Sequence, residues 1–347
     1  MLYKTFLDIA DSGIKAPSAD NQHVFRLELT DSTIRLWPSD EFDATIDPLR
    51  RTLGLISVGA VVENMQLRAN ELGLACAVKW LDTNAKCPFA ELNFNALPNT
   101  TTDELAKAIP NRHTNRRMYR GPKLNEDQTR QLNDAAVSVK GVQLIWLDGA
   151  ARRTALGLIW RAESERFLRQ RLHQDLFCSI RFDLPWDATA ERALPPGALE
   201  IEAPMRPLFK ALRNWRLMRP LTWLGIHHLI GLRAGLLPCW QAPTLGLLVT
   251  SLTLDQGAIA AGAALERVWL RATLLELAMQ PLAASAMLLL QSDLDEGASA
   301  KLRSTLKSGW QTIAPGSSPM MLFRMGHAAK PAIRTAREPV NNYLRAV

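Results

Sequence analysis

Apolar residues recur at helical spacing along two long stretches of the chain. In the first stretch the apolar positions are Leu49, Leu53, Ile56, Ala60, Leu67 and Leu72. Gly73 follows them, at a position where helices often end. The second stretch, 256–279, consists mostly of glycine and alanine near its start. Because small side chains keep a helix slim, the pattern predicts two long helices that suit the centre of a packed interface.

Shorter patterns surround these two helices. The chain opens with an amphipathic helical pattern that ends before Pro17, because the residue preceding a proline avoids the α region. Strands are predicted at 24–29, 33–38, 77–81, 91–96, 142–147, 245–251 and 320–324, and helices at 128–136 and 150–172. Eight prolines within 185–243 predict a largely irregular segment. Helix, strands and slim helix occur twice, around 54–75 and 257–279, which alone is weak evidence for a duplicated α+β unit.

The composition is that of a globular protein with a basic balance. Hydrophobic types form 47% of the 347 residues and charged types 22%, enough for one large or two ordinary cores. The net charge is +7 and the isoelectric point is about 9.4. This balance suits an anionic ligand, nucleic acid or an acidic membrane surface, and it does not choose among them.

Cysteine use and hydropathy narrow the compartment. The four cysteines, Cys76, Cys87, Cys178 and Cys239, form no CxxC pair, so a cysteine zinc site or a disulfide framework is improbable and a reducing cytoplasm is expected. The N-terminal segment carries acids and no long apolar run, unlike a secretory leader. The most hydrophobic stretch, 272–291, includes a glutamate and a proline, which argues against a membrane span.

A basic cluster at 111–117 is the first candidate for chemistry. Arg112, Thr114 and Arg116 alternate with His113 and Asn115. Arginine offers planar charge-assisted donors and threonine a short hydroxyl, so the run suits a phosphate group. Such runs are also common in solvated surface loops.

A rigid turn at 16–22 is the second candidate. Pro17, Ser18 and Asn21 place a hydroxyl and a carboxamide at fixed offsets. A carboxamide both donates and accepts, as the edge of a pyrimidine-like ring requires. The same residues are frequent in ordinary turns.

Two further segments have both a functional and an ordinary interpretation. Arg334 and Arg337 form either a second cationic clamp or a basic tail. The sequence Gln280-Pro281-Leu282 breaks the second slim helix, and it either aims a backbone amide at a ligand or only stops the helix.

Together these segments resemble the FMN-dependent nitroreductase family. The resemblance rests on 112–116, on the turn at 16–22, on Leu72-Gly73-Leu74, and on Arg324-Met325-Gly326 followed by the basic stretch 334–337. It covers most of the chain apart from about 183–240. The turn precedes the arginine segment here, which is similar to the fused, Acg-type branch of the family, in which one chain imitates the dimer.

The resemblance implies an α+β, nitroreductase-like fold with two fused halves, 1–108 and 109–347, and a seam at the polar segment 98–102. Mixed or antiparallel sheets, flanked by helices, would surround the two slim helices. One FMN would lie between the halves, in a monomer that imitates a dimer or in a dimer of such chains. Arg112, Thr114 and Arg337 would hold the phosphate, helped by Arg334.

The same carry-over implies roles for the other residues of the site. His113 and Arg116 would lie along the ribityl chain and the ring edge, and Pro17, Ser18 and Asn21 would contact the ring. The turn at Gln280, Pro281 and Leu282 would approach N5. No metal and no catalytic side chain are expected, because the flavin would supply the chemistry.

The implied activity is ping-pong hydride transfer from NAD(P)H through the flavin to a small electron-poor acceptor. An alternative is a non-catalytic FMN-sequestering protein with a lid, and another is a partner-dependent interaction module. The insertion at 183–240 is a lid, a helical addition packed on the core, or a docking surface for an anionic membrane or, through its basic part at 200–240, for a protein. Nucleic acid is not an expected partner.

Overall fold

The computed structural model describes residues 2–30, 32–43, 47–82, 87–97, 102–291 and 297–345. Its strands form two four-stranded antiparallel sheets. The first sheet contains β1 (Phe25–Leu29), β2 (Thr33–Pro38), β3 (Leu74–Trp80) and β4 (Ala90–Ala96). The second contains β5 (Val142–Trp146), β6 (Thr244–Thr250), β7 (Ala278–Leu282) and β8 (Ser318–Gly326). Most of the predicted seam, 98–101, lies outside the described residues.

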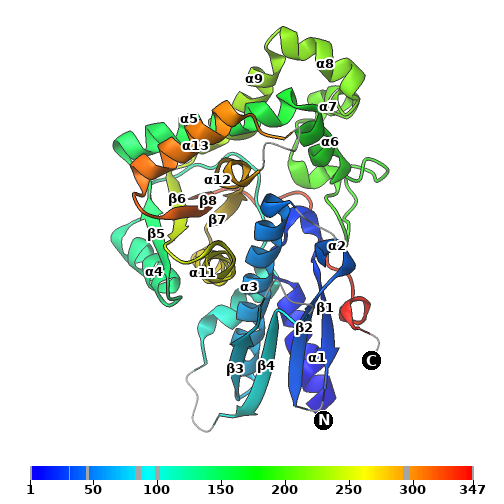
Figure 1. Cartoon of the computed structure of the whole chain (residues 1–347), viewed down its shortest axis with the longest axis vertical. Helices are drawn as coiled ribbons and strands as arrows, with labels where there is room; N and C mark the ends of the chain where they lie inside the picture. Colours follow the sequence, from blue (N-terminus) through cyan, green and yellow to red (C-terminus); the bar gives the residue numbers. More distant parts are fainter. Residues whose placement is uncertain are drawn as a thin grey trace.

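The two sheets share one topology. Their strand orders are β1-β2-β4-β3 and β5-β6-β8-β7, so each is a hairpin-linked antiparallel sheet with the same crossover between its third and fourth strands in sequence. A long helix precedes the third strand of each sheet: α3 (Pro48–Glu71) and α11 (Leu254–Leu274). These helices lie side by side at the centre of the molecule (Figure 1). The predicted α+β class, with antiparallel sheets around two slim helices, is therefore confirmed.

Two glycines allow the central helices to cross at van der Waals distance. A Cβ on Gly59 of α3 would lie 2.0 Å from the carbonyl oxygen of Ile259, and a Cβ on Gly262 of α11 would lie 1.9 Å from that of Ile56. The two contacts are mirror partners at one sequence offset, since 259 minus 56 and 262 minus 59 are both 203. The crossing is thus a pseudo-twofold axis that relates the two halves.

This offset reveals a repeat in the sequence itself. At a shift of 203, 11 of the 22 residues in 54–75 are identical to those in 257–278. The identical pairs include Glu63 with Glu266 and Arg68 with Arg271. After each helix the chain turns at a left-handed residue, Gly73 with φ of 75° and Glu276 with φ of 56°. The halves are therefore duplicated in sequence as well as in topology, which the earlier pattern alone supported only weakly.

The remaining helices cover the two sheets and the central pair. In the first half, α1 (Leu2–Ile14) packs along α3, and α2 (Asp40–Asp43) precedes it. In the second half, α4 (Glu126–Val137) packs on α11, while α5 (Gly149–Leu168) and α13 (Ala300–Ile313) pack against each other beyond the second sheet (Figure 1). The short α12 (Ala284–Met287) follows β7.

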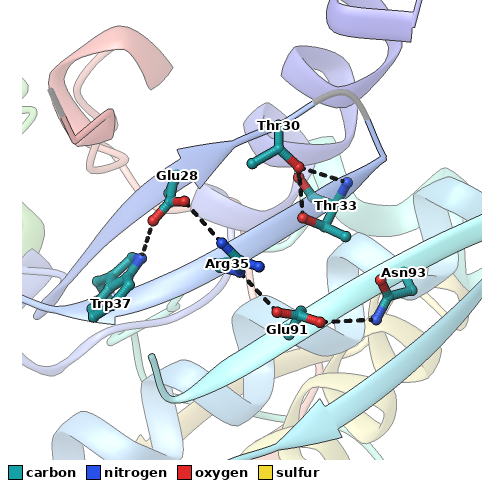
Figure 2. A network of polar contacts seen from close by, with 7 residues as sticks. All are labelled: Glu28, Thr30, Thr33, Arg35, Trp37, Glu91 and Asn93. Carbon is teal, nitrogen blue, oxygen red and sulfur yellow. Dashed lines mark hydrogen bonds and ion pairs between the residues drawn. The ribbon is translucent and has the colours of Figure 1, made fainter. Parts of the chain in front are cut away.

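Polar side chains cover the solvent face of the first sheet. Arg35 on β2 donates to Glu28 on β1 at 3.1 Å and to Glu91 on β4 at 2.8 Å, and Trp37 donates to Glu28 at 2.6 Å (Figure 2). The alternate residues Leu27, Ile34 and Leu36 are fully buried against α1 and α3. The alternation fixes which face of the sheet points inward.

Three predicted elements end differently in the structure. The second slim helix ends at Leu274, and Gln280, Pro281 and Leu282 belong to strand β7 instead of a turn. An edge position tolerates the proline, because one side of the strand needs no ladder donor. The helix predicted at 150–172 is interrupted at Arg169, after which α6 (Gln170–Cys178) begins.

The insertion is more helical than its prolines predict. An irregular segment, 179–202, contains only the short η3 (Pro196–Leu199), but 206–241 forms α7 (Arg206–Leu212), α8 (Trp215–Trp223), α9 (Ile226–Gly231), the π-helical η5 (Leu232–Leu236) and α10 (Leu237–Gln241). Pro207 and Pro238 lie in the first turns of their helices, where a missing N–H costs nothing. In Figure 1, α8 and α9 form a hairpin at the far end of the molecule.

The end of the chain returns to the first half. Leu344 pairs with Leu27 of β1, and the backbone N–H of Arg345 donates to the carbonyl of Leu27 at 2.8 Å. The predicted boundary at 108 falls inside η2 (Glu104–Asn111), which packs on both α3 and α11. The halves therefore share elements, and the division at 108/109 stays a prediction.

Candidate functional site

One large cavity, of about 1640 Å³, lies between the turn after α1, the start of α3, strand β7, the C-terminal segment and the insertion. Twelve residues were expected from the sequence to form the site, and all twelve line this cavity: Pro17, Ser18, Asn21, Arg112, His113, Thr114, Arg116, Gln280, Pro281, Leu282, Arg334 and Arg337. The fold thus brings together segments that are far apart in the sequence.

The turn after α1 is held from the opposite side of the cavity. Asp20 and Asn21 adopt left-handed backbone with φ of 51° and 59°, which short polar side chains tolerate. Asn21 is buried, and its Nδ2 lies 3.2 Å from the carbonyl oxygens of Ala190, Glu191 and Ala193 in the insertion. The turn and the segment 190–193 are therefore fastened together.

Two of the expected arginines bind the C-terminal end of α1. Arg112 donates from Nη2 to the carbonyl of Lys15 at 2.7 Å. Arg337 donates from Nε to Ile14 at 2.9 Å, from Nη2 to Ala16 at 2.8 Å and from Nη1 to the Asn21 side chain. The last carbonyls of a helix lack intrahelical partners and carry partial negative charge, which explains the attraction. Arg337 therefore joins the halves with all three guanidinium nitrogens.

Arg112 also faces the acid of the pseudo-twofold repeat. Its Nε lies 3.2 Å from Oε1 of Glu266, with the two side chains 5% and 0% exposed. The guanidinium also stacks 4.5 Å from the ring centroid of Trp269. Burial raises the pKa of Glu266 to about 7 against the opposing pull of Arg112, and burial lowers the pKa of Arg112. A proton is therefore easily held at this carboxylate.

Arg324 is a functional candidate that sequence reasoning did not select. It lines the cavity from β8, is completely buried, and stacks 3.9 Å from the ring centroid of Tyr119. Its Nε donates to the Gln280 side chain at 2.7 Å and its Nη2 to the carbonyl of Arg117 at 2.9 Å. Burial lowers its pKa. The signal was available, because Arg324 is the one charged residue within the apolar strand β8.

The cavity wall carries an excess of shielded positive charge. Within the described chain, the four arginines 112, 116, 324 and 337 make a single ion pair, that of Arg112 with Glu266. Arg116 donates to the carbonyl of Ala198 at 3.2 Å, and burial lowers its pKa. Burial also lowers the pKa of Arg337 to about 10, with Arg112 adding to the effect. Unpaired cations removed from water are costly, so the site favours an anionic occupant.

Polar groups in the wall also lack partners. The hydroxyl of Ser18 and Nη1 of Arg324 are buried and have no hydrogen-bond partner among the described residues. Buried polar atoms normally find a partner, so these two groups indicate a polar ligand in the cavity. The donor set therefore fits a molecule that has both an anionic group and a ring edge with donors and acceptors.

The remaining residues of the basic cluster divide into free and structural groups. No described residue bonds the exposed guanidinium of Arg334, which lies near His113 and contributes to lowering the His113 pKa after burial, the larger cause. Asn115 is structural: its N–H donates to Met279 at 3.1 Å and its Nδ2 to Ala329 at 2.9 Å. Asn115 thereby fixes the cluster to the end of β7.

The far end of the cavity is apolar and belongs to the insertion. The side chains that line it come from α6, α7, α9 and the residues beside them: Leu172, Leu176, Met205, Leu208, Phe209, Leu212, Ile226, Leu229 and Ile230. The cavity is larger than the roughly 300–1,000 Å³ of common ligand pockets. It therefore has room for an anionic ligand at one end and an apolar molecule at the other.

No family model and no curated protein matches this chain. Among solved structures, it is similar to a nitroreductase-like family protein from Bacillus cereus, at 11% identity over 72% of this chain and 99% of that chain, with a TM-score of 0.36. An FMN-dependent nitroreductase from Mycobacterium smegmatis, solved with NADPH, is 15% identical over 70% and 98%, with a TM-score of 0.40. An NADPH:FMN oxidoreductase from Vibrio harveyi, solved with NAD+, is 9% identical over 70% and 77%, with a TM-score of 0.37.

Proposed function

We propose that this chain is an FMN-binding oxidoreductase of the nitroreductase type, which takes hydride from NAD(P)H and passes it to a small electron-poor acceptor. The observation that carries the proposal is the group of four shielded arginines with one carboxylate partner, in the cavity that all twelve expected residues line. An anionic cofactor would balance this charge. The solved nitroreductases bind FMN by their own titles, and we extend that ligand to this chain as part of the proposal.

In this proposal the residues of the chain bind and orient the cofactor. Thr114 and Arg334 offer donors to the phosphate, while Arg112 and Arg337 supply positive charge behind them and hold the end of α1. Ser18 and Arg324 supply the unpartnered hydroxyl and N–H for the ring edge. Gln280, Pro281 and Leu282 form one wall from β7. Bound FMN supplies hydride transfer, and the protein supplies position and electrostatics.

The phosphate assignment is tested by comparing FMN with riboflavin, which lacks the phosphate. We expect calorimetric titration to give markedly tighter binding of FMN, and Arg334→Met to weaken FMN by about 1.5–3 kcal/mol, the usual strength of a charge-assisted bond. The same substitution should leave riboflavin unchanged. Arg345→Met is the matched control, because Arg345 lies on the C-terminal segment over Trp37, away from the cavity. Equal affinity for the two flavins would refute the assignment.

A second candidate function, FMN sequestration under a lid, is favoured by one observation. The segment 190–198 fastens to Asn21 and Arg116 from above the cavity. Stopped-flow mixing of the flavin-loaded protein with NADH or NADPH separates the two functions. Bleaching of the flavin within seconds supports the reductase, and an unchanged spectrum over minutes supports sequestration.

Opening the lid provides the matched variant. Asn21→Ala removes the amide that reaches three carbonyls of the insertion. If the lid excludes nicotinamide, this variant bleaches and the parent protein does not. If the parent already bleaches, the lid interpretation fails. A purified protein that is colourless and takes up no added FMN would contradict both functions.

A further inference from the structure

The insertion exposes large apolar side chains at one end of the molecule. Eight of the 15 exposed large hydrophobic residues lie within 203–240: Met205, Leu208, Leu217, Trp223, Leu224, Leu229, Leu232 and Trp240. Trp223 is 81% and Leu224 76% exposed, at the turn that joins α8 to α9. This turn is at the tip of the projecting hairpin (Figure 1). Apolar residues scattered over a surface are ordinary, but a concentration of this kind marks an interaction site.

The same segment carries only positive formal charge. Between 203 and 240 there are six basic residues and no aspartate or glutamate: Arg206, Lys210, Arg213, Arg216, Arg219 and Arg233. Arg233 pairs with Glu202, just outside the segment. Lys210, Arg216 and Arg219 form no ion pair with any described carboxylate. The surface around the hairpin is therefore cationic and not neutralised by the rest of the described chain.

The helices are anchored on one face and bare on the other. Leu212 and Met218 are buried in a cluster with Phe167, Phe177 and Ile180, which fixes α7 and α8 to the body. The apolar side chains at the tip point away from that cluster and remain exposed. A rigid amphipathic hairpin with tryptophan and leucine at its end and arginines beside them is suited to the interface of an anionic bilayer.

We propose that residues 203–240 dock this protein on the surface of an anionic phospholipid membrane. Trp223 and Leu224 enter the boundary between headgroups and acyl chains, and Arg216, Arg219 and Lys210 contact lipid phosphates. Docking is peripheral, because no helix among the described residues has the length and apolar character to cross a bilayer. The inference does not depend on the bound cofactor.

The position of the cavity agrees with this docking. Met205, Leu208, Leu229 and Arg233 line the cavity and are also exposed on the insertion surface. The apolar end of the cavity therefore opens beside the face that would lie on the lipid. A docked molecule would take apolar ligands from the bilayer without passing them through water.

Vesicle co-sedimentation tests the proposal with the full-length protein. We expect binding to vesicles of 70% phosphatidylcholine and 30% phosphatidylglycerol to be at least 10-fold tighter than to pure phosphatidylcholine, and to be lost when sodium chloride is raised from 0.1 to 0.5 M. Each basic residue near an anionic surface contributes about fivefold in affinity. Arg216→Gln with Arg219→Gln should therefore weaken binding about 25-fold.

Two further variants separate insertion from general charge. Trp223→Ser with Leu224→Ser removes exposed side chains only, so the fold should persist, as thermal unfolding will check, while vesicle binding falls at least 10-fold. Lys301→Gln with Lys307→Gln removes two exposed charges from α13 and serves as the control that keeps binding. Equal loss in this control, or equal binding to neutral vesicles, overturns the proposal. So does a dimer, seen by sedimentation equilibrium without lipid, that the Trp223 variant dissociates while vesicles fail to bind, because the face would then join two copies.

Discussion

The two central helices carry equivalent acids in different surroundings. Glu63 on α3 and Glu266 on α11 are related by the pseudo-twofold repeat, and both are buried. Glu63 pairs with Arg267 at 2.6 Å, and Arg267 also reaches Asp103 at the start of η2. Glu266 instead faces Arg112 beside the large cavity. The duplicated frame is therefore symmetric, and the chemistry built on it is not.

The difference shows how one site is closed while the other is kept open. On the Glu63 side, η2 packs its Leu105, Ala106, Ala108 and Ile109 against both helices. On the Glu266 side, Leu265 and Trp269 line the cavity, whereas Val62 and Gln66 at the equivalent positions of α3 do not. The second half also carries the insertion, which has no counterpart in the first. A duplicated frame can thus keep its stability while only one side holds a ligand.

The largest expected effect is at the crossing, where the halves should behave alike. Gly59→Ala and Gly262→Ala each place a Cβ about 2 Å from a backbone carbonyl, so the helices must separate. We expect each to lower the free energy of unfolding by about 3 kcal/mol or more, because neither neighbour can move aside. Urea denaturation followed by circular dichroism measures the loss. Costs that differ by more than about 1 kcal/mol would contradict the pseudo-twofold relation.

Gly157→Ala is the matched control for the crossing. Gly157 also lies inside a long helix, α5, but its Cβ would meet only the flexible Arg161 side chain, at 3.1 Å. Alanine should stabilise this helix by about 0.5–1 kcal/mol, the ordinary preference over glycine. A loss comparable to that of Gly59→Ala would mean that helical glycines here are sensitive for another reason.

The second effect should distinguish the halves. Arg267→Met removes the partner of Glu63, and Arg112→Met removes the partner of Glu266. Each should lower the free energy of unfolding by about 1–3 kcal/mol, because a buried polar group loses its partner. Only Arg112→Met should also weaken FMN, by roughly 10-fold or more, since it alone borders the cavity. Denaturation and calorimetric titration of the same samples measure both quantities.

A surface variant calibrates this comparison. Arg35→Met breaks the exposed network of the first sheet (Figure 2), which should cost less than about 1 kcal/mol and leave FMN affinity unchanged. If Arg267→Met weakens FMN as much as Arg112→Met does, the two sides are functionally equivalent and the asymmetry assigned here is wrong.

Much of this arrangement follows from the sequence, and the limits have physical causes. The slim helices and six of the seven predicted strands follow from local periodicity, and the third strand was predicted at 77–81 where β3 spans Leu74–Trp80. Strand β7 was missed, because Pro281 after a long helical pattern indicates a stop and the edge position that tolerates it is set by tertiary pairing. The helices at 206–241 were missed for a similar reason, since the prolines fall in first turns that the sequence alone does not locate.

The site was predicted as a set of residues but not as a set of bonds. Residue types and order brought the twelve cavity residues together. Nothing local, however, indicates that Arg337 spends its donors on the end of α1, or that Arg324 is buried without a carboxylate partner. Both facts depend on packing between segments hundreds of residues apart. The repeat at an offset of 203 was present in the sequence and became evident only once the crossing supplied the register.

The smallest expected effect is a pH dependence confined to the first half's side of the cavity. His23 is buried, with Nε2 2.8 Å from the carbonyl of Ile14, and burial together with Arg337 lowers its pKa from 6.5 to about 3. Between these values the unfolded chain binds a proton that the folded chain does not, so stability falls as pH falls. From pH 6.5 to 5.5 we expect a loss of about 1 kcal/mol from this group, measured by urea denaturation. In His23→Gln this part of the slope should vanish. An unchanged slope would mean that His23 takes up its proton in the folded protein and that the end of α1, where Arg112 and Arg337 converge, is open to water.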